Sequence, residues 1–547
     1  MDLLWKKTSD IAGSSYVNLF ENVKIGTSNL EASMAPALRG MFSYTHKGDK
    51  SSVDFRLQGN QKFLQKKWIE AMASYNRSLC FAEIGSENVS MAFANRSACF
   101  YHLKEYKKSL IDIELAVQAN YPSHLMPKLI ERRENCLKSI QAGEGTETFE
   151  PVLSYESSEV LPGCADVLKI QVNAQLGRFV TANCNIPAGK TVLVEEAFMG
   201  RPGETRYGRC AVCCKAAMNF IACSICTNAM FCDTNCVNAK NVHEMECNYN
   251  YDDTNKLELH LEFIAHSIFV AMSIFSDIDS LMDFVQDVVK EKSKPVPQTL
   301  NDEKSKYRAF LQLSFFFTPS TWEDYLGLAH DWYNNLMLRD FITERFDTEE
   351  KKTFFMHLTL HHIMIASTNA YVPAPGDARL LCIASSYFNH SCEPNVFRVN
   401  YQNSLVFITT RPIRAGEQLY VRYNESIDGE SVARRQNHFM EKYGFRCKCE
   451  RCEPAVPGPL VDMYTKGLAA HPDYQYVLTE IQQEPGLNFE DNAKLMLLQS
   501  KCLDLLNQFG DDHWFPALGS LTSIFSQIYK KMLHPHDDNV GFNFIRK

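Results

Sequence analysis

The spacing of apolar residues changes several times along the chain, and each change predicts a different kind of structure. Three long stretches have the pattern of helices, and they cover residues 55–140, 256–370 and 460–533. Short β-branched runs begin at Val167 with KIQVN and TVLVEEAF, and similar runs return in residues 379–424 as LVFIT and QLYVRY. Such runs predict strands. The chain is therefore predicted to be a multidomain α+β protein, β-rich in its centre and helical towards both ends.

The first helical stretch contains an internal repeat of 38 residues. Small and aromatic or apolar positions recur in it as two matching sets: Gly59, Trp68, Ala71 and Tyr75, then Ser97, Tyr106, Ser109 and Ile113. Small residues let paired helices approach and aromatic residues fill the space between them, so this pattern resembles a tetratricopeptide repeat. The first repeat is lengthened around Ile84–Asn88, and a third helix over Pro127–Ile140 is expected to cap the stack.

The composition argues against several classes of protein. The 547 residues are 45% hydrophobic and 22% charged, as in ordinary globular proteins. The net charge of −9 argues against a general nucleic-acid binder. The N-terminus has no apolar run of signal-peptide length, and the longest apolar stretch, Phe263–Phe275, is too short to cross a bilayer. We expect an intracellular monomer, cytoplasmic and nuclear, that does not enter a membrane.

Cysteine is the unusual residue, because the chain contains 19 of them. Disulfides are rare in a reducing compartment, so metal binding is the leading explanation. Between residues 210 and 247 lie four pairs with two or three residues between their members: Cys210 and Cys213, Cys223 and Cys226, Cys232 and Cys236, and His243 and Cys247. Four such pairs supply two tetrahedral zinc sites. The alternative is a set of buried structural cysteines, and Cys214 is an extra thiol that we do not expect to bind metal.

A second cysteine group near the C-terminal end of the β-rich region suggests a third zinc site. Cys447, Cys449 and Cys452 supply three close thiolates, so a tetrahedral ion needs a fourth ligand from elsewhere. Cys392 is the candidate. If it closes the site, residues 55 apart in sequence become neighbours, and the chain binds three zinc ions.

Three further segments belong with these cysteines: LGRFVTA at 176–182, YFNHSCEPN at 387–395, and GEQLYVRYN followed by YGFRCKCERC, which ends at Cys452. The cysteine pairs resemble a MYND finger. Taken together, the motifs resemble the SET and MYND domain-containing lysine methyltransferases, in particular the subfamily with an N-terminal tetratricopeptide region. The finger resemblance implies two interleaved ligand sets: Cys210, Cys213, Cys232 and Cys236 on one zinc, and Cys223, Cys226, His243 and Cys247 on the other.

The resemblance and the hydrophobic pattern together predict the order of domains. We expect a leader (1–50), tetratricopeptide-like repeats (51–142), the first part of a SET domain (160–209), the MYND finger (210–247), a helical insertion (248–370), the second part of the SET domain (371–424), a post-SET zinc segment (425–453) and a C-terminal helical region (454–547).

The resemblance also implies an activity and the residues that carry it. The expected activity is methyl transfer from S-adenosylmethionine to a lysine of a histone or non-histone protein. Tyr423 takes the position of the active-site tyrosine, and Tyr443 that of a second phenol near the lysine. The residues implied to contact the cofactor are Gly177, Arg178, Phe179, Asn369, Asn389, His390, Tyr423 and Phe445.

Each of these assignments has a more ordinary alternative. A tyrosine that ends a strand is usually a core residue. Asn389 and His390 taken alone are typical of a turn. Many SET domains carry a second glycine after the GR pair, whereas Phe179 and Val180 follow here, which bears on cofactor affinity. The whole chain could also be a weakly catalytic scaffold that recruits chaperones or transcriptional corepressors.

Partner sites are expected on the repeats and on the finger. Residues four apart share a helical face, so five side chains are expected to converge on a carboxylate: Arg56, Asn60, Asn95, Lys128 and Arg132. This set is similar to the clamp with which tetratricopeptide domains grip acidic chaperone tails, and a solvated basic face is the alternative. Residues 201–247 carry five basic and four acidic residues, which favours a peptide ligand such as a proline-rich segment over phosphate.

Overall fold

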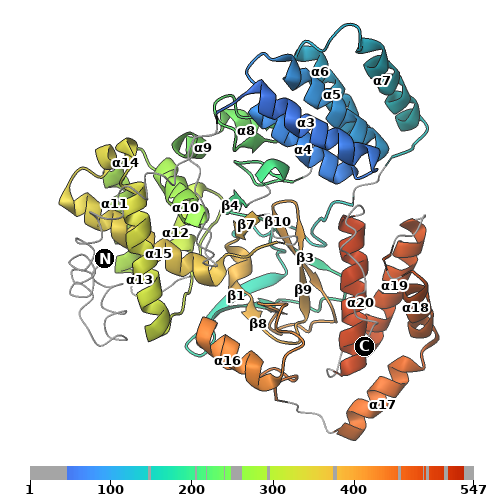
Figure 1. The fold of residues 1–547 in the computed structure, drawn as a ribbon. Coiled ribbons are helices and arrows are strands. Elements are labelled where there is room, and N and C mark those ends of the chain that lie inside the picture. Colours follow the sequence, from blue (N-terminus) through green and yellow to red (C-terminus); the bar gives the residue numbers. More distant parts are fainter. Residues whose placement is uncertain are drawn as a thin grey trace. The chain divides into compact units, whose positions relative to one another are not determined.

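The computed structural model describes most of the chain, drawn as a ribbon in Figure 1. Its described residues form two compact units. Unit 1 lies within Met1–Glu147, Met199–Lys290 and Trp322–Leu381, and unit 2 within Thr148–Phe198, Glu291–Thr321 and Cys382–Lys547. The described residues are 46–145, 149–203, 206–216, 218–239, 241–247, 261–291, 296–373, 378–453, 458–484, 486–487, 492–510 and 515–534. Nearly all of the expected leader lies outside these ranges.

The first part of unit 1 is a stack of paired helices, seen in blue to teal in Figure 1. These are α3 (Asp49–Leu64), α4 (Trp68–Phe81), α5 (Glu87–His102), α6 (Tyr106–Gln118) and α7 (Met126–Gln141). The first two pairs begin at 49 and 68, then at 87 and 106, so the helices repeat with the 38-residue period expected from the sequence.

The small residues of the repeat lie where paired helices touch. A Cβ atom on Gly59 would lie 2.4 Å from the ring of Tyr75, so α3 and α4 approach this closely only because the position is glycine. In the second pair, the Ser109 hydroxyl donates to the Ser97 carbonyl over 2.9 Å. Gly59 and the matching Ser97 thus both lie where the helices of a pair touch, although their contact partners, Tyr75 and Ser109, are not matching positions.

The cysteine-rich segment, residues 206–247, packs directly on the repeats. It contains β5 (Ile221–Ala222), β6 (Met230–Phe231), α8 (Thr234–Asn238) and α9 (Asn241–Glu246). One hydrophobic cluster joins the two parts, with Leu79, Phe93 and Ile113 from the repeats and Phe220 and Met230 from the cysteine-rich segment. The repeats and the cysteine-rich segment therefore share a core.

A buried ion pair lies at the centre of this joint. Arg96 donates to both carboxylate oxygens of Asp112, each over 2.7 Å, and both side chains are almost fully buried. Arg96 also donates to the carbonyl of Phe220, and the Asn219 amide donates to Asp112 over 2.7 Å. Asn76 accepts a further bond from Arg96. A buried charge pair is tolerated when hydrogen bonds satisfy it, and here the cysteine-rich segment supplies two of those bonds.

The rest of unit 1 is mainly helical. Its helices are α10 (Leu261–Ile274), α11 (Ile278–Lys290), α13 (Pro319–Leu336), α14 (Asp340–Arg345) and α15 (Glu349–Asn369), and its strands β4 (Met199–Pro202) and β7 (Ala378–Leu381) form an antiparallel pair. The sequence predicted one helical stretch here and did not predict β4. No helix among the described residues is long and apolar enough to span a bilayer.

The described residues of unit 2 form three small sheets. A hairpin is formed by β1 (Leu168–Asn173) and β2 (Gly177–Ala182), and β3 (Thr191–Glu196), β10 (Ser404–Thr409) and β9 (Val396–Tyr401) form a three-stranded antiparallel sheet in that order. The third sheet is a parallel pair of β8 (Asn389–His390) and β11 (Tyr420–Val421). Within the predicted strand QLYVRY, Tyr420 and Val421 form this pair, and Gln418 makes an isolated antiparallel bridge with Thr181.

Helices complete unit 2. The sheet packs through Phe397, Val406 and Ile408 against the C-terminal helices α17 (Gly458–Ala469), α18 (Pro472–Gln483), α19 (Asn492–Phe509) and α20 (Pro516–Leu533), drawn in orange to red in Figure 1. The sequence did not predict α16 (Val432–Tyr443), and α12 (Glu303–Leu311) lies in unit 2 as well. The α+β class and the helical regions at both ends are confirmed.

The buried pair at the repeat joint gives a stability prediction. The Arg96→Met variant leaves the Asp112 carboxylate buried without its cation, so we expect the free energy of unfolding of unit 1 to fall by about 3–5 kcal/mol. Urea titration of the full chain measures this. The control is Lys290→Met, which removes an exposed pair with Asp287 and is expected to change stability by less than about 0.5 kcal/mol. Equal midpoints for the two variants would contradict the role assigned to Arg96.

Candidate active site and metal centres

Three groups of cysteine and histidine side chains converge, and within each group the ligand atoms all lie within 4.8 Å of one another. The first two groups are in unit 1 and have the interleaved membership implied by the family resemblance: Cys210, Cys213, Cys232 and Cys236, and Cys223, Cys226, His243 and Cys247. The extra thiol Cys214 belongs to neither group. The expectation of three clusters is confirmed.

Local hydrogen bonds shape the turns that carry these ligands. The Asp233 carboxylate accepts the backbone N–H of Cys236 over 2.8 Å and so begins α8 between two ligands of the first group. In the second group, the Ile225 N–H points at the sulfur of Cys223 over 3.4 Å, and the Cys223 N–H bonds the Ala229 carbonyl. Each turn therefore presents its sulfur atoms to one side.

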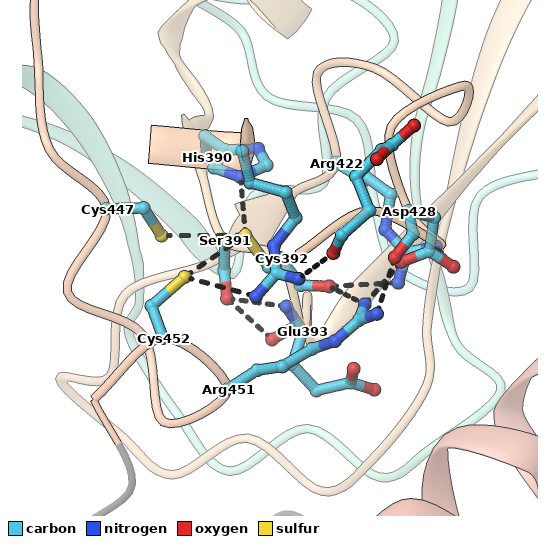
Figure 2. Close-up of polar contacts among 11 residues, drawn as sticks. His390, Ser391, Cys392, Glu393, Arg422, Asp428, Cys447, Arg451 and Cys452 are labelled. Atoms are coloured by element: carbon cyan, nitrogen blue, oxygen red, sulfur yellow. Dashed lines mark hydrogen bonds and ion pairs between the residues drawn. The ribbon is translucent and has the colours of Figure 1, made fainter. Parts of the chain in front are cut away.

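The third group joins two distant segments of unit 2, as Figure 2 shows. The sulfur of Cys392 lies 3.9 Å from that of Cys447 and 3.6 Å from that of Cys452. Cys449 completes the group. The Gln436 side chain, on α16, bonds both backbone groups of Cys447, over 2.6 and 3.0 Å, so the cysteine-rich tip is fixed to that helix.

The spacing of these donors fits a tetrahedral metal ion. Four thiolates around zinc at about 2.3 Å place neighbouring sulfur atoms about 3.8 Å apart. The six ligand-to-ligand distances that we measure across the three groups run from 3.4 to 4.0 Å. The donors, all cysteine sulfur apart from one histidine nitrogen, are those that zinc prefers.

The NHSC segment lies against Tyr423, which follows the end of β11 by two residues. His390 accepts the backbone N–H of Tyr423 at Nδ1 over 3.1 Å, and the Tyr423 hydroxyl donates to the Phe388 carbonyl over 3.1 Å. Burial lowers the pKa of His390 to about 3, so the ring is neutral and can accept this bond. Burial also raises the pKa of Tyr423 above its ordinary value, so this phenol keeps its proton.

Aromatic rings surround Tyr423. The centroid of Tyr443 lies 5.0 Å from that of Tyr423, and Phe445 lies 6.3 Å from Tyr423 and 6.0 Å from His390. Burial raises the pKa of Tyr443 to about 12. Gly444 lets the chain turn between Tyr443 and Phe445: its φ is +74°, and a Cβ atom there would lie 2.4 Å from the ring of Phe316.

The glycine–arginine pair begins β2 at the tight turn of the hairpin. Gly177 has a φ of +64°, which favours glycine, and the Asn389 amide donates to the neighbouring Leu176 carbonyl over 3.4 Å. The Arg178 guanidinium lies over the Tyr387 ring at 4.8 Å and donates to the Gln312 carbonyl over 2.7 Å. The hairpin turn and the NHSC segment thus adjoin each other.

Two other residues, Phe179 and Asn369, are predicted to contact the cofactor. Phe179 is buried on β2, so its side chain is part of the core, and only its backbone is suited to bind a ligand. Asn369 ends α15 in unit 1, where its amide donates to the Ile365 carbonyl over 3.0 Å. Asn369 lies in a different unit from the other predicted cofactor residues, and its role stays a prediction.

The five residues of the expected clamp all lie on the repeats, and three of them take part in hydrogen bonds. Asn60 accepts from Asn95 and from the Tyr75 hydroxyl, each over 3.0 Å. Arg132 donates to Ala94 and Ser97, each over 2.8 Å. Arg56 has a buried Nε without an acceptor among the described residues, and Lys128 is exposed.

Sequence reasoning missed several residues that position the site. Glu195 accepts three backbone N–H groups, from Ile383, Ala384 and Ser385, at 2.7 to 2.8 Å, and so holds the segment that leads into Tyr387. The buried Asn395 accepts the Tyr420 N–H and donates to the Gln418 carbonyl. Asn395 stands in the YFNHSCEPN motif and Glu195 in the predicted strand TVLVEEAF, but nothing in the sequence marked either residue as one that positions the site.

Comparison with known proteins identifies the family that matches the part of the chain with these site residues. The SET domain family matches residues 177–424. Protein-lysine N-methyltransferase SMYD4 of Danio rerio is 22% identical over 500 residues, covering 74% of this chain and 66% of that protein, and its Homo sapiens counterpart is 22% identical over 548 residues, covering 74% and 67%. SET domain-containing protein 3 of Caenorhabditis elegans is 28% identical over 324 residues, covering 55% and 62%.

The chain thus spans about two thirds of the length of these SMYD4 relatives. A solved structure of the SET domain of LSMT bound to lysine and AdoHcy matches at a TM-score of 0.27 and 11% identity, covering 68% of this chain and 85% of that one, which is too remote to inform the site. The chain contains a SET domain and is a relative of the SMYD4 protein-lysine N-methyltransferases.

Proposed function

We propose that the protein is an S-adenosylmethionine-dependent protein-lysine N-methyltransferase. The observation that carries the proposal is the convergence of the hairpin turn at Gly177, the NHSC segment and the three rings of Tyr423, Tyr443 and Phe445 within one unit. The SET match over residues 177–424 and the SMYD4 relatives support it. Histone and non-histone proteins are both candidate substrates.

The residues present fit the cofactor that this reaction needs. The exposed turn at Gly177 and the backbone of Arg178 and Phe179 would hold it together with Asn389 and His390, and the ring of Phe445 would pack on its adenine. When bound, the cofactor supplies a methyl group on a positively charged sulfur. The chain's own task is to align a lysine amine with that methyl group and to exclude water.

Tyr423 and Tyr443 are suited to this task because both remain protonated phenols. The Tyr423 hydroxyl donates its hydrogen bond to the Phe388 carbonyl. The lone pairs of the Tyr423 oxygen therefore remain available to accept a hydrogen bond from an incoming amine. A lysine amine has a pKa near 10.4 in water, and an apolar aromatic surrounding disfavours its charged form. The site therefore promotes loss of the lysine proton without a strong base.

The three cysteine clusters support a proposal of three bound zinc ions. The first two clusters would form a MYND finger and the third a post-SET site that holds the NHSC segment against the Cys447–Cys452 tip. Metal binding would supply folding free energy to segments that have little core of their own. A finger surface for proline-rich peptides, and a cytoplasmic and nuclear location, belong to the same proposal.

The repeats support a second proposal, a binding site for the acidic C-terminal tail of a chaperone. Burial raises the pKa of Tyr75, and the charges of Arg56 and Arg132 both act in the opposite direction. The buried Nε of Arg56 has no acceptor among the described residues. This is what we expect of an arginine that pairs with the carboxylate of a bound peptide.

The catalytic assignment of Tyr423 predicts a loss of turnover. The Tyr423→Phe variant removes the oxygen that orients the amine, and we expect methyl transfer to fall on the order of 10²-fold while the cofactor Kd stays near that of the wild type. The rate of methyl transfer is measured by mass spectrometry of a panel of purified proteins incubated with isotopically labelled cofactor. The cofactor Kd is measured by calorimetry. Tyr420→Phe, whose hydroxyl bonds Gln418, is the matched control. Unchanged turnover would remove Tyr423 from this role, and a wild type that binds no cofactor would favour the scaffold alternative.

Metal analysis tests the three clusters. We expect three zinc ions per chain in the wild type and two in Cys392→Ser, because that substitution removes one of four ligands. Plasma mass spectrometry of the folded protein gives the ratio. Cys184→Ser alters an exposed cysteine outside the clusters and should retain three ions. Three ions in both variants would separate Cys392 from the metal.

Peptide titration tests the repeats. Lys128→Ala removes one cation from the clamp, so we expect the Kd for an Hsp90-type C-terminal peptide to rise about tenfold. Lys138→Ala, an exposed lysine of the same helix on a different face, should leave the Kd unchanged. The proposal fails if the wild type does not bind the peptide, or if both variants bind it equally well.

A further inference from the structure

A group of charged side chains links the third cysteine cluster to the segment after β11, where Tyr423 lies. Two arginines reach the carbonyl of Cys392: Arg422 over 2.9 Å and Arg451 over 3.5 Å. Arg422 immediately precedes Tyr423, and Arg451 lies between Cys449 and Cys452. Both arginines also pair with one carboxylate, that of Asp428, as Figure 2 shows.

Asp428 holds each arginine by a different oxygen. Its Oδ2 lies 2.9 Å from Arg422 Nη1, its Oδ1 pairs with Arg451 Nη1, and its backbone carbonyl accepts from Arg451 Nη2 over 2.5 Å. The carboxylate therefore cross-links two cations that would otherwise repel each other beside the same carbonyl. Without it, an extended conformation of one arginine into solvent becomes the more favourable state.

The proposed metal site would explain why three arginines gather here. A zinc ion bound by the four thiolates would carry a net negative charge, and Arg435 points at the sulfur of Cys452 over 3.5 Å. Arg422 and Arg451 approach from the side of Cys392. The Asp428 side chain is 40% exposed, and those of Arg422 and Arg451 are 26% and 23% exposed. Pairs this exposed stabilise a fold only weakly, so their main effect is on geometry.

We infer that Asp428 is a positioning residue for Tyr423, acting through Arg422. Tyr423 is already held on one side, where its backbone N–H bonds His390 and its hydroxyl bonds Phe388. Arg422 is the residue directly before Tyr423, just after the end of β11, so the ion pair and hydrogen bond of Arg422 fix the backbone next to Tyr423. The inference rests on the proposed function for its kinetic consequence but not for its structural one.

The test compares Asp428→Asn with the matched control Glu430→Gln. Glu430 lies two residues away and its carboxylate pairs only with the 75% exposed Arg434, which contacts no part of this group among the described residues. The full chain is labelled with 3-fluorotyrosine at position 423 and observed by fluorine NMR. We expect one narrow resonance in the wild type and in Glu430→Gln, and a shifted and broadened one in Asp428→Asn.

The kinetic arm uses the same proteins without the fluorine label. We expect Asp428→Asn to lower kcat about tenfold, since small misplacements of a reacting group have effects of this size, with an unchanged cofactor Kd and three zinc ions retained. In a double variant with Tyr423→Phe, the loss should equal that of Tyr423→Phe alone, because Asp428 then has nothing left to position.

Three results would overturn the inference: a fluorine resonance that Asp428→Asn does not alter, losses in the double variant that multiply, or release of the third metal ion by Asp428→Asn, which would assign the carboxylate to the metal site. If the wild type transfers no methyl group, the proposed function fails, and the fluorine spectrum alone still decides whether Asp428 positions Tyr423.

Discussion

The convergence of Cys392 with Cys447, Cys449 and Cys452 is the constraint on which the candidate active site depends. It places the NHSC segment beside the turn that follows α16, so that His390, Tyr423, Tyr443 and Phe445 share one neighbourhood. The apolar cluster at this point is small, with Cys392, Phe439 and Cys447 as its buried members. Metal binding would therefore have to supply the stabilisation that a hydrophobic core supplies in other parts of the fold.

In unit 1, the buried ion pair of Arg96 and Asp112 helps to join the repeats to the cysteine-rich segment. Arg96 and Asp112 lie on adjacent helices of the repeats, yet their hydrogen-bonding needs are met in part by Asn219 and Phe220 of the cysteine-rich segment. An apolar pair could bury similar area without this requirement. Buried ionic groups fix one arrangement more than they add stability, and this pair accepts only a partner that supplies a carbonyl and an amide at the right places.

The parts of the fold that depend on local spacing could be predicted from the sequence. Pairs such as Cys210 and Cys213 follow from the reach of two thiolates on one turn, and the 38-residue repeat follows from the positions of small and aromatic residues. Cys392 could be named because tetrahedral coordination requires a fourth ligand. In each case physical chemistry fixes a spacing, a repeat length or a number of ligands, which can be checked directly in the sequence.

Other features could not be predicted, because they depend on contacts between residues far apart in the sequence. Nothing around Glu195 shows that its carboxylate meets three backbone N–H groups almost 190 residues later. The polar helix α16 has few buried residues to mark it, with Arg435 and Phe439 on its inner face. Asp428 stands in a short polar turn, and its role becomes visible only when Arg422 and Arg451 are seen beside it.

The core shared by the repeats and the cysteine-rich segment has a consequence for the order in which the chain is made. The helices α3–α7 leave the ribosome before the cysteine-rich segment, with Leu79, Phe93 and Ile113 on the face that Phe220 and Met230 later cover. During synthesis of the intervening strands of unit 2, that face and the Arg96–Asp112 pair lack their final partners. A nascent chain of this length exposes a surface of the kind that chaperones recognise, and only completion of the cysteine-rich segment removes it.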